Sequence, residues 1–390
     1  MDITSRIDKN IAYIALEGRI DASNANTAEE KIFAIKNENA EKHIVIDADN
    51  LEYISSAGLR VILKLRKEVA DLVIINVAPE VYDVLDMTGF TDIVTVEKAY
   101  KRMSVEGCEF LAKGANGAVY RYDDETIIKT YYSKDALPEI QQERESARKA
   151  FVLGVNTAIP YGIVRVGDGY GTVTELLNAV NVTKLLCDDP INIEKPVKYF
   201  VDLLKSIHAV EANEGDFPDM KETALDWARF VANYIPEAYA KKLCDMVEAV
   251  PKQNTLLHGD YHTNNVMIQN DEPLLIDLDT LCVGHPVFEL GSMYNAFCGF
   301  SELDHSEIKR FMGYDRDTGG RFWTMSLKKY LGTEDEAIWR AVEDKARVIG
   351  YVRLLRRTIR RINEDGAEQK IKYYKEKLIE LIDKIDSLTF

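Results

Sequence analysis

The chain has 390 residues, of which 49 are Lys or Arg and 65 are Asp or Glu, so its formal net charge is −16. A surface this negative repels nucleic acid, and no apolar run reaches the ~18 residues that a membrane-spanning helix needs, so neither nucleic acid nor a membrane is an expected partner. The five cysteines are scattered without a CxxC pair and the N-terminus is polar, which favours a cytoplasmic protein over a secreted one.

The first hundred residues alternate between two kinds of segment. Short β-branched runs predict strands, and longer segments with apolar residues at helical spacing predict helices. The expected strands are residues 11–20, 42–49, 71–77 and 92–99, and the expected helices are residues 22–38, 56–70 and 79–90. This alternation predicts an α/β domain with a small mixed sheet and helices packed on it.

The pattern changes near residues 101–110. A strand-rich region with several glycines follows, and after it the chain is mainly helical to its end. No Gly/Ser-rich or Pro-rich linker marks the change, so the boundaries rest on pattern alone. We expect a domain at residues 1–103, a strand-rich lobe at 104–178 and a helical lobe at 179–390.

A glycine turn lies between two strands of the second region, in the stretch "LAKGANGAVYRYDDETIIKTYY". Gly114, Asn116 and Gly117 form a turn at which backbone amides could approach phosphate oxygens closely. The next strand carries Lys129, which could reach the α- and β-phosphates of a nucleotide. The sequence therefore predicts a nucleotide cradle here.

A lysine in that position needs a carboxylate to hold it. The helix expected at residues 138–154 offers three candidates, which are Glu139, Glu143 and Glu145. The residue pattern alone does not choose among them.

The stretch "LHGDYHTNNVMIQNDEPLLIDLDT", residues 257–280, holds the densest group of polar residues at fixed spacing. Asp260 precedes Asn265 by five positions, and Asp277 follows twelve later at the end of an apolar run. Mg²⁺ prefers oxygen ligands and also binds phosphate oxygens. Phosphoryl transfer needs such a metal together with a carboxylate that orients the attacking hydroxyl. We expect Asp260 in the second role and Asn265 and Asp277 as metal ligands.

Simpler interpretations exist for each of these residues. Asp260 could cap a turn, Lys129 could be an edge-strand lysine, and asparagines are common in turns. His258 and His262 stand four apart and could bind zinc on a helix, but a glycine lies between them and no helical pattern runs through. It is the ordered set of features that favours a phosphate site.

A basic segment, "RLLRRTIRR", lies near the C-terminus. Arg353, Arg356, Arg357 and Arg360 fall at helical spacing, opposite an apolar stripe. A solvated helix face is one interpretation. The alternatives are contacts with an anionic substrate or with the acidic N-terminal region.

At the phosphate-handling residues the chain resembles the aminoglycoside phosphotransferase and choline kinase group, over residues 108–390. That group shares the bilobal α+β protein-kinase fold, so the resemblance implies ATP and Mg²⁺ as cofactors. His-Gly-Asp with an Asn five residues after the Asp is the group's catalytic motif. It is met by His258, Asp260 and Asn265, and His258 is expected to hydrogen-bond inside the loop.

The same resemblance assigns further residues. Asp277 matches the metal aspartate of the Ile-Asp-x-Asp motif. Glu145 matches the helix glutamate that holds the lysine, with Glu143 as its close rival. The backbone around Glu175 to Leu177 resembles the hinge that binds adenine.

The chain departs from the group's patterns at three points. Ala112 replaces the first glycine of the protein-kinase loop, and Glu289 stands where an aspartate is commoner. No acidic pocket for an aminoglycoside is readable, so an antibiotic acceptor is not assumed.

Residues 1 to about 100 resemble the STAS domain of bacterial anti-sigma factor antagonists, through "EGRIDASNA" and "VIDADNLEYISSAGLRVIL". In the antagonists a partner kinase phosphorylates the serine that corresponds to Ser56. Ser55 stands where the family often has Asp. A phosphate at this helix start would lie on free amides and could switch docking, whereas an unmodified N-cap serine is the plainer interpretation.

Three functions follow from these patterns. The first is an ATP-dependent phosphotransferase acting on a hydroxyl of a small molecule, with the STAS module as regulator or docking domain. The second is a signalling switch, in which the kinase part phosphorylates Ser56 and the STAS surface binds an anti-sigma-factor-like partner. The third is a catalytically silent nucleotide-binding scaffold.

Overall fold

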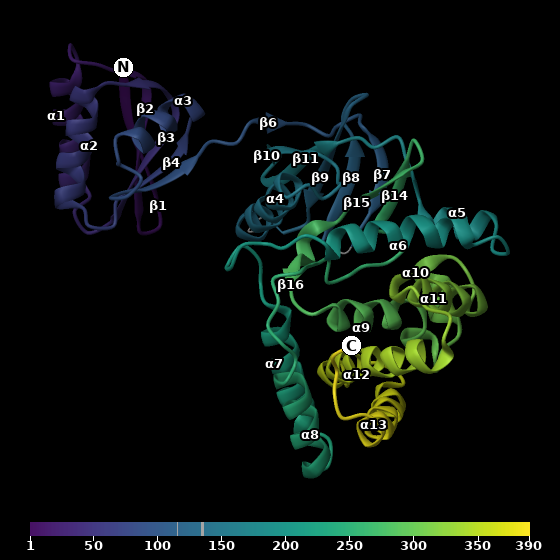
Figure 1. The fold of residues 1–390 in the computed structure, drawn as a ribbon. Helices are drawn as coiled ribbons and strands as arrows, with labels where there is room; N and C mark the ends of the chain where they lie inside the picture. Colours follow the sequence, from purple (N-terminus) through teal and green to yellow (C-terminus); the bar gives the residue numbers. More distant parts are fainter. Residues whose placement is uncertain (115, 134–135) are drawn as a thin grey trace. The chain divides into compact units, whose positions relative to one another are not determined.

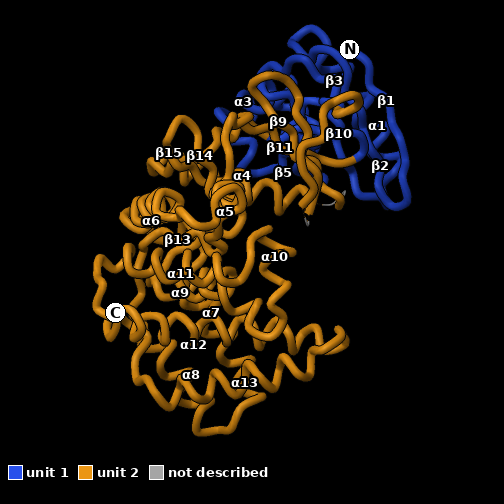
Figure 2. The backbone as a smooth tube through the Cα atoms, turned by 90° about the vertical axis from the view of Figure 1, so that its right-hand side faces the viewer, with its two compact units in different colours: residues 1–104, 163–168 blue, residues 105–162, 169–390 orange. Residues whose placement is uncertain are grey.

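The computed structural model describes residues 1–114, 116–133 and 136–390 (Figure 1). The chain divides into two compact units, drawn in different colours in Figure 2. The first comprises Met1–Ser104 with Ile163–Asp168, and the second comprises Val105–Gly162 with Gly169–Phe390.

The first unit is built on a five-stranded sheet in the order β1-β2-β3-β4-β5. β1 runs antiparallel to β2, and the other neighbouring strands are parallel. Helices α1 and α2 lie side by side (Figure 1). The elements are β1 (Asp2–Asp8), β2 (Ile11–Ile20), α1 (Ala25–Glu38), β3 (His43–Ile54), α2 (Ser56–Glu68), β4 (Val73–Val77), α3 (Pro79–Met87) and β5 (Thr95–Lys98).

Alternation of buried and partly exposed residues explains β2, the second strand of this sheet. Ala12, Ile14 and Leu16 are buried on one face of β2, and the residues between them are partly exposed. This period of two is what the sequence predicts for a half-buried strand. β1 lacks such a pattern, because Ile3 alone among its residues is even half-buried, so the sequence did not predict this edge strand.

Helix α2 begins at a capped serine. The Oγ of Ser55 accepts a hydrogen bond from the amide of Gly58 at 3.4 Å, whereas Ser56 is the first helical residue and is exposed. A Cβ on Gly58 would lie 2.7 Å from side-chain carbons of Ile20 and Ile54. The helix can therefore approach the sheet this closely because residue 58 is a glycine.

The second unit opens with four antiparallel strands in the order β11-β9-β8-β7. A long helix, α4, follows β9 in the chain. The elements are β7 (Glu109–Lys113), β8 (Gly117–Arg121), β9 (Thr126–Tyr131), α4 (Leu137–Val152) and β11 (Gly169–Glu175). β6 (Arg102–Met103) pairs in parallel with β10 (Pro160–Val166).

The remainder of the second unit is mainly helical, and its helices α9, α11, α12 and α13 gather away from the β7–β9 strands (Figure 1). Two small sheets, β12-β14-β15 and β13-β16, lie within it. The elements are β12 (Val180–Asn181), α5 (Val182–Asp188), α6 (Glu194–His208), α7 (Met220–Ala232), α8 (Glu237–Glu248), β13 (Leu256–Leu257), β14 (Val266–Gln269), β15 (Glu272–Leu275), η1 (Leu278–Thr280), β16 (Cys282–Val283), α9 (Pro286–Phe297), η2 (Gly299–Ser301), α10 (Ser306–Met312), α11 (Arg316–Leu331), α12 (Glu336–Arg360) and α13 (Ala367–Lys384).

Helix α9 forms the centre of this helical core. Every residue from Val287 to Phe297 is buried, so the helix is enclosed on all sides by other elements. It packs against α7, α11 and α12. Within the described parts of the chain, no helix is both long and apolar enough to cross a membrane.

Candidate active site

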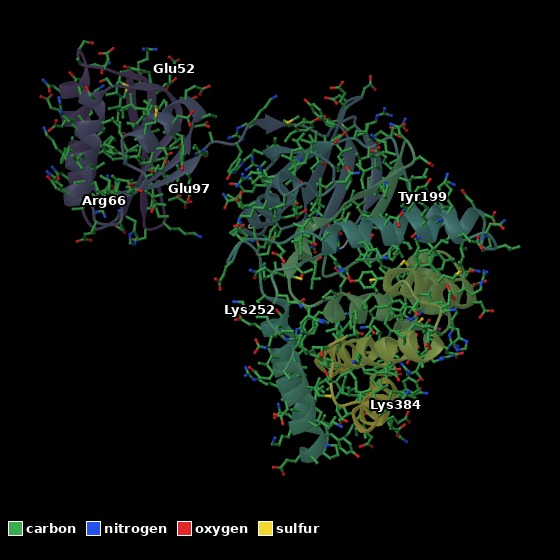
Figure 3. The ribbon with its side chains drawn as sticks, in the orientation of Figure 1. Glu52, Arg66, Glu97, Tyr199, Lys252 and Lys384 are labelled. Atoms are coloured by element: carbon green, nitrogen blue, oxygen red, sulfur yellow. The ribbon has the colours of Figure 1, made fainter. Side chains whose placement is uncertain are left out.

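A tight hairpin positions one side of the site. β14 and β15 are joined by Asn270 and Asp271, both with positive φ, as the two-residue turn of a twisted hairpin requires. Tyr199, labelled on α6 in Figure 3, donates a hydrogen bond to the Asp271 carboxylate, and Lys195 forms an ion pair with it at 2.8 Å. The hairpin is thereby fixed to α6, with Asn265 just before β14 and Asp277 just after β15.

The loop between β13 and β14 carries the His-Gly-Asp motif. His258 is fully buried, its Nε2 lies 3.2 Å from the carbonyl of Ile276, and its Nδ1 accepts from the amide of Asp260. Gly259 has φ +81°, and a Cβ there would lie 2.4 Å from the carbonyl oxygen of Thr280. The loop can pass this close to Thr280 because residue 259 has no side chain.

Glu289 supports this loop from α9. Its buried carboxylate accepts hydrogen bonds from the backbone amides of His258 and Gly259, the latter at 3.1 Å. Burial alone would raise the pKa of Glu289, but the neighbouring His208 and His258 hold that pKa below its ordinary value. The longer Glu side chain thus performs the loop-supporting role expected of the commoner aspartate.

Asp260 is an ionised carboxylate among nitrogen donors. Burial alone would raise its pKa, but His262, 3.5 Å away, and Arg353, 3.6 Å away, lower it to about 2. The side-chain amide of Asn265 donates to the backbone carbonyl of Asp260 at 3.1 Å. Asp260 therefore carries a negative charge throughout the physiological pH range.

The carboxylates of Asp277, Asp279 and Glu143 lie close enough to repel one another. Asp279 has its pKa raised to about 6 by burial and by the charges of Asp277 and Glu143. Asp277 itself adopts φ +61°, a conformation uncommon outside glycine. A cation would relieve this repulsion, so the donor set fits Mg²⁺.

The described residues place no three His, Cys, Asp or Glu side chains in one metal-binding group. If Asn265 and Asp277 bind Mg²⁺, as the sequence predicts, phosphate oxygens and water would complete the coordination shell. That arrangement is usual for Mg²⁺, which binds proteins through one or two carboxylates plus substrate phosphates.

Lys129 joins the strand-rich and helical parts of the second unit. From β9, its Nζ lies 2.8 Å from Glu143 Oε1 on α4 and 3.7 Å from Asp277 Oδ1. Burial alone would lower the pKa of Lys129, but the two carboxylates raise it above its ordinary value, so the ammonium group stays charged.

The expectation that Glu145 holds this lysine is wrong. Glu145 pairs instead with Arg148, one turn along α4, at 2.7 Å, and its side chain is 41% exposed. Residues 143 and 145 are separated by about 200° around a helix, so they face opposite sides of it. Glu143, which lies on the buried side, holds Lys129.

Tyr131 completes this cluster and was not predicted. Its hydroxyl donates to Glu143 Oε2 at 2.8 Å, and it lies 3.5 Å from the Thr172 hydroxyl on β11. Lys129 and Tyr131 are two apart on one strand and share a face. That spacing was the signal that could have found Tyr131.

The two glycines of the predicted cradle differ in the space that surrounds them. A Cβ on Gly117 would lie 1.9 Å from the carbonyl oxygen of Thr130, whereas nothing lies closer than 3.9 Å to a Cβ on Gly114. The amide of Gly114 donates to the carbonyl of Gly117 at 2.9 Å, and the carbonyl of Asn116 accepts from Tyr132 at 3.0 Å. The first bond joins the end of β7 to the start of β8, and the second joins the start of β8 to the residue after β9.

The predicted hinge lies at the end of β11. The amide of Glu175 donates to Ile159, and that of Leu176 donates to Glu125 at 2.7 Å. Among the described residues the amide of Leu177 has no hydrogen-bond partner. It is therefore the amide here that is available to a ligand.

Arg353 is a further contact that the sequence did not place. Its guanidinium on α12 donates to the carbonyl of Gly259 at 3.2 Å and to the hydroxyl of Ser292, and it lies beside Asp260. The sequence showed a basic helix, but no pattern shows that a helix 90 residues downstream meets the catalytic loop.

Two family models match the chain. The phosphotransferase enzyme family matches residues 107–320, and the STAS domain matches residues 2–103. BtrV of Bordetella bronchiseptica, which is named as an anti-sigma factor antagonist, is 36% identical over 85 residues, covering 21% of this chain and 72% of that protein.

Solved structures give a consistent but weaker likeness. The ADP-bound aminoglycoside phosphotransferase APH(2'')-Ib is 13% identical, with 78% of this chain and 99% of that chain covered and a TM-score of 0.47. Amicoumacin kinase hAmiN in complex with AMP-PNP, Ca²⁺ and Ami is 15% identical, with 79% and 94% covered and a TM-score of 0.47. Both TM-scores lie below 0.5, so the assignment rests on the sequence matches.

The fold expected from the sequence is confirmed, because a STAS domain precedes a kinase-like α+β domain. The three segment boundaries and the roles of the individual site residues remain predictions. The chain belongs to the phosphotransferase enzyme family and carries a STAS domain at residues 2–103.

Proposed function

We propose that the chain transfers the γ-phosphate of ATP to a hydroxyl group of a small acceptor. The observation that carries this proposal is the position of Lys129, whose ammonium group lies 2.8 Å from Glu143 and 3.7 Å from Asp277. A charged lysine held between two lobes, next to the expected metal ligand, suits the binding of a nucleotide polyphosphate.

Asp260 orients the acceptor in this proposal. A carboxylate with a pKa of about 2 is a weak base, so it accepts a hydrogen bond from the acceptor hydroxyl and takes its proton late, as the bond to phosphorus forms. The hydroxyl oxygen attacks the γ-phosphorus in line, the bond to the bridging oxygen breaks, and ADP leaves. Arg353 and His262 hold Asp260 in place.

The other residues bind the donor. Lys129 pairs with the α- and β-phosphates, and the free amide of Leu177, next to Glu175, bonds the adenine edge. Asn265 and Asp277 would hold Mg²⁺, which when bound offsets the negative charge of the transferring phosphoryl group.

An ATP-consumption assay on the full-length protein tests the proposal. The protein is incubated with ATP and Mg²⁺ against a panel of small hydroxyl compounds, and Asp260→Asn is the matched variant. We expect acceptor-dependent ADP release that Asp260→Asn reduces by roughly 100-fold or more. Equal turnover by the wild type and Asp260→Asn would refute the role of Asp260.

A regulatory role for the STAS domain is favoured by one observation at α2. Ser55 is engaged as the helix cap, whereas Ser56 is exposed beside the free amides of the first turn. A phosphate on Ser56 would add nearly two negative charges there and alter a docking surface. We propose an anti-sigma-factor-like protein as the partner, because BtrV is named as an anti-sigma factor antagonist.

The signalling version adds that the kinase part of the chain modifies Ser56 itself. Incubation with γ-labelled ATP and Mg²⁺, followed by mapping of the label, tests it. Self-modification is supported if Ser56 of the wild type is labelled and the label is absent from both Ser56→Ala and Asp260→Asn. It is refuted if the wild-type chain stays unlabelled even with excess enzyme.

A further inference from the structure

A cluster of cations and one indole ring lies next to the catalytic aspartate. Arg353 and Arg356, one turn apart on α12, each lie 5.7 Å from the centre of the Trp227 ring on α7. Guanidinium groups at this distance from an indole face are attracted to it. Trp227 and Arg356 are both half-buried, so this cluster is part of the folded surface and not a row of mobile side chains.

Arg353 connects this cluster to Asp260. Arg353 lies 3.6 Å from Asp260 Oδ1 and donates to the carbonyl of Gly259 at 3.2 Å. Because Arg353 contacts both Asp260 and the Trp227 ring, that ring and Arg356 are within a small molecule's length of Asp260. An acceptor whose hydroxyl meets Asp260 can therefore reach these groups.

Arg356 forms no close ion pair within the part of the chain that the structure describes. No carboxylate of the described residues lies within 4.0 Å of it, although its helix neighbour Arg361 has Glu364 at 3.6 Å. The nearby Asp226 raises the pKa of Arg356 by its charge, but its ion pair is with Arg229, at 3.7 Å. Burial and the charge of Arg360 both lower the pKa of Arg356. An unpaired, partly desolvated arginine in a chain with net charge −16 costs free energy that a bound anion would recover.

A solvated helix face does not account for this arrangement. Arginines on a solvated face often pair with surface carboxylates, and this chain has 65 acidic residues to provide them. Arg356 is half-buried, forms no ion pair within 4.0 Å among the described residues, and lies against the same indole ring as Arg353, which is beside Asp260. The charge also disfavours cationic amino sugars as acceptors, because they would bring like charges together.

We propose that the acceptor is a small hydroxy compound carrying a carboxylate or phosphate group, which Arg356 binds while Trp227 packs against its carbon skeleton. This inference rests on the proposed function, since it names the class of molecule that Asp260 acts upon. Arg353 serves as a positioning residue, because its Nη1 donates to Gly259 and Ser292 and its Nη2 lies 3.6 Å from Asp260.

Direct binding of anions tests the site without turnover. Trp227 is half-buried, whereas Trp323 and Trp339 are 1% and 6% exposed, so Trp227 dominates any fluorescence response to a ligand at this position. The full-length protein, saturated with ADP and Mg²⁺, is titrated with inorganic phosphate and with glycerate. We expect a saturable fluorescence change that Trp227→Phe abolishes and that needs at least 10-fold more anion in Arg356→Gln. Arg356→Lys should recover part of the affinity.

Arg360→Gln is the matched control, because it removes the same charge from the same helix one turn further on. It should change the affinity by less than 3-fold. No saturable change, or one that Arg356→Gln leaves intact, overturns the proposal. Occupation of the cluster by carboxylates of the N-terminal region would also block these anions and count against it.

A turnover assay separates this inference from the proposed function. ATP consumption is compared for glycerate and glycerol, which differ in the anionic group, and for choline as a cation. Preference for glycerate that Arg356→Gln removes supports the inference. ATP-dependent phosphorylation of glycerol or choline in preference to glycerate overturns the anionic acceptor while the kinase stands. Absence of any ATP turnover together with intact Arg356-dependent phosphate binding overturns the kinase and leaves the anion site.

Discussion

Lys129 forms its ion pair with Glu143, at 2.8 Å, and not with Glu145 two residues later. The choice is fixed by the geometry of α4, since residues two apart on a helix point in opposite directions. Glu143 faces β9 and also accepts a hydrogen bond from Tyr131, whereas Glu145 faces outward to Arg148. One half-buried carboxylate therefore holds both the lysine and the tyrosine of the nucleotide side.

The first prediction concerns this pair. Glu143→Gln leaves Lys129 without its main counter-charge, so we expect kcat/KM for ATP to fall roughly 10- to 100-fold. Glu145→Gln removes a surface pair and should change that value by less than about 2-fold. Steady-state kinetics on both variants measures the difference, and equal losses in the two would contradict the assignment.

The second prediction concerns the buried carboxylate beneath the catalytic loop. Glu289→Gln replaces an acceptor of two backbone amides with a group that also carries donors, so we expect the free energy of unfolding to fall by about 1–3 kcal/mol. Urea denaturation measures it. Glu364→Gln, in an exposed pair with Arg361, is the control and should stay within about 0.5 kcal/mol of the wild type. A Glu289→Gln variant as stable as the control would show that the loop does not depend on this carboxylate.

The third prediction distinguishes the two serines of α2. Ser55→Ala removes the helix cap and should lower the stability of the STAS domain by about 0.5–2 kcal/mol. Ser56→Ala leaves the cap in place and should change stability by a few tenths of a kcal/mol at most. Thermal unfolding of the full-length variants checks this, and the reverse order would mean that Ser56 caps the helix in solution.

The fourth prediction uses the two glycines of the turn as a matched pair. Gly117→Ala would place a Cβ 1.9 Å from the Thr130 carbonyl oxygen, so the β8–β9 pairing must shift, at a cost of about 1–3 kcal/mol. Gly114→Ala meets nothing closer than 3.9 Å and should be nearly neutral for stability. Hydrogen exchange of the β9 amides reports the loss directly. Unchanged protection in Gly117→Ala would contradict the close approach.

Local spacing was enough to bring together most of the site. Asp260, Asn265 and Asp277 lie within one stretch of 257–280, so a loop and a hairpin suffice to place them near one another. Lys129 could be assigned to the same site because it lies on a strand that follows the glycine turn closely in the chain, and such a strand stays near the turn. These residues are close in sequence or fixed by one short element, which is why a single sequence reveals them.

The features that sequence missed depend on long-range packing or on weak patterns. β1 is polar and lies at a sheet edge, so no alternation marks it. Arg353 meets Gly259 through the packing of α12 against α9, and nothing local to either residue predicts that contact. The glutamate was misassigned because counting along a motif ignored which side of α4 faces β9.

We propose that Asp277, Lys129 and Asp260 form one phosphoryl-transfer site. The Asp277→Ala variant is the sharpest test of this proposal. Purified wild-type and variant proteins are compared for release of ADP from ATP with Mg²⁺ and an accepted hydroxyl compound, after circular dichroism shows that both are folded. We expect the rate of ADP release by Asp277→Ala to be lower than that of the wild type by roughly 1,000-fold or more, with the fold unchanged. Full activity in a folded Asp277→Ala protein would contradict it.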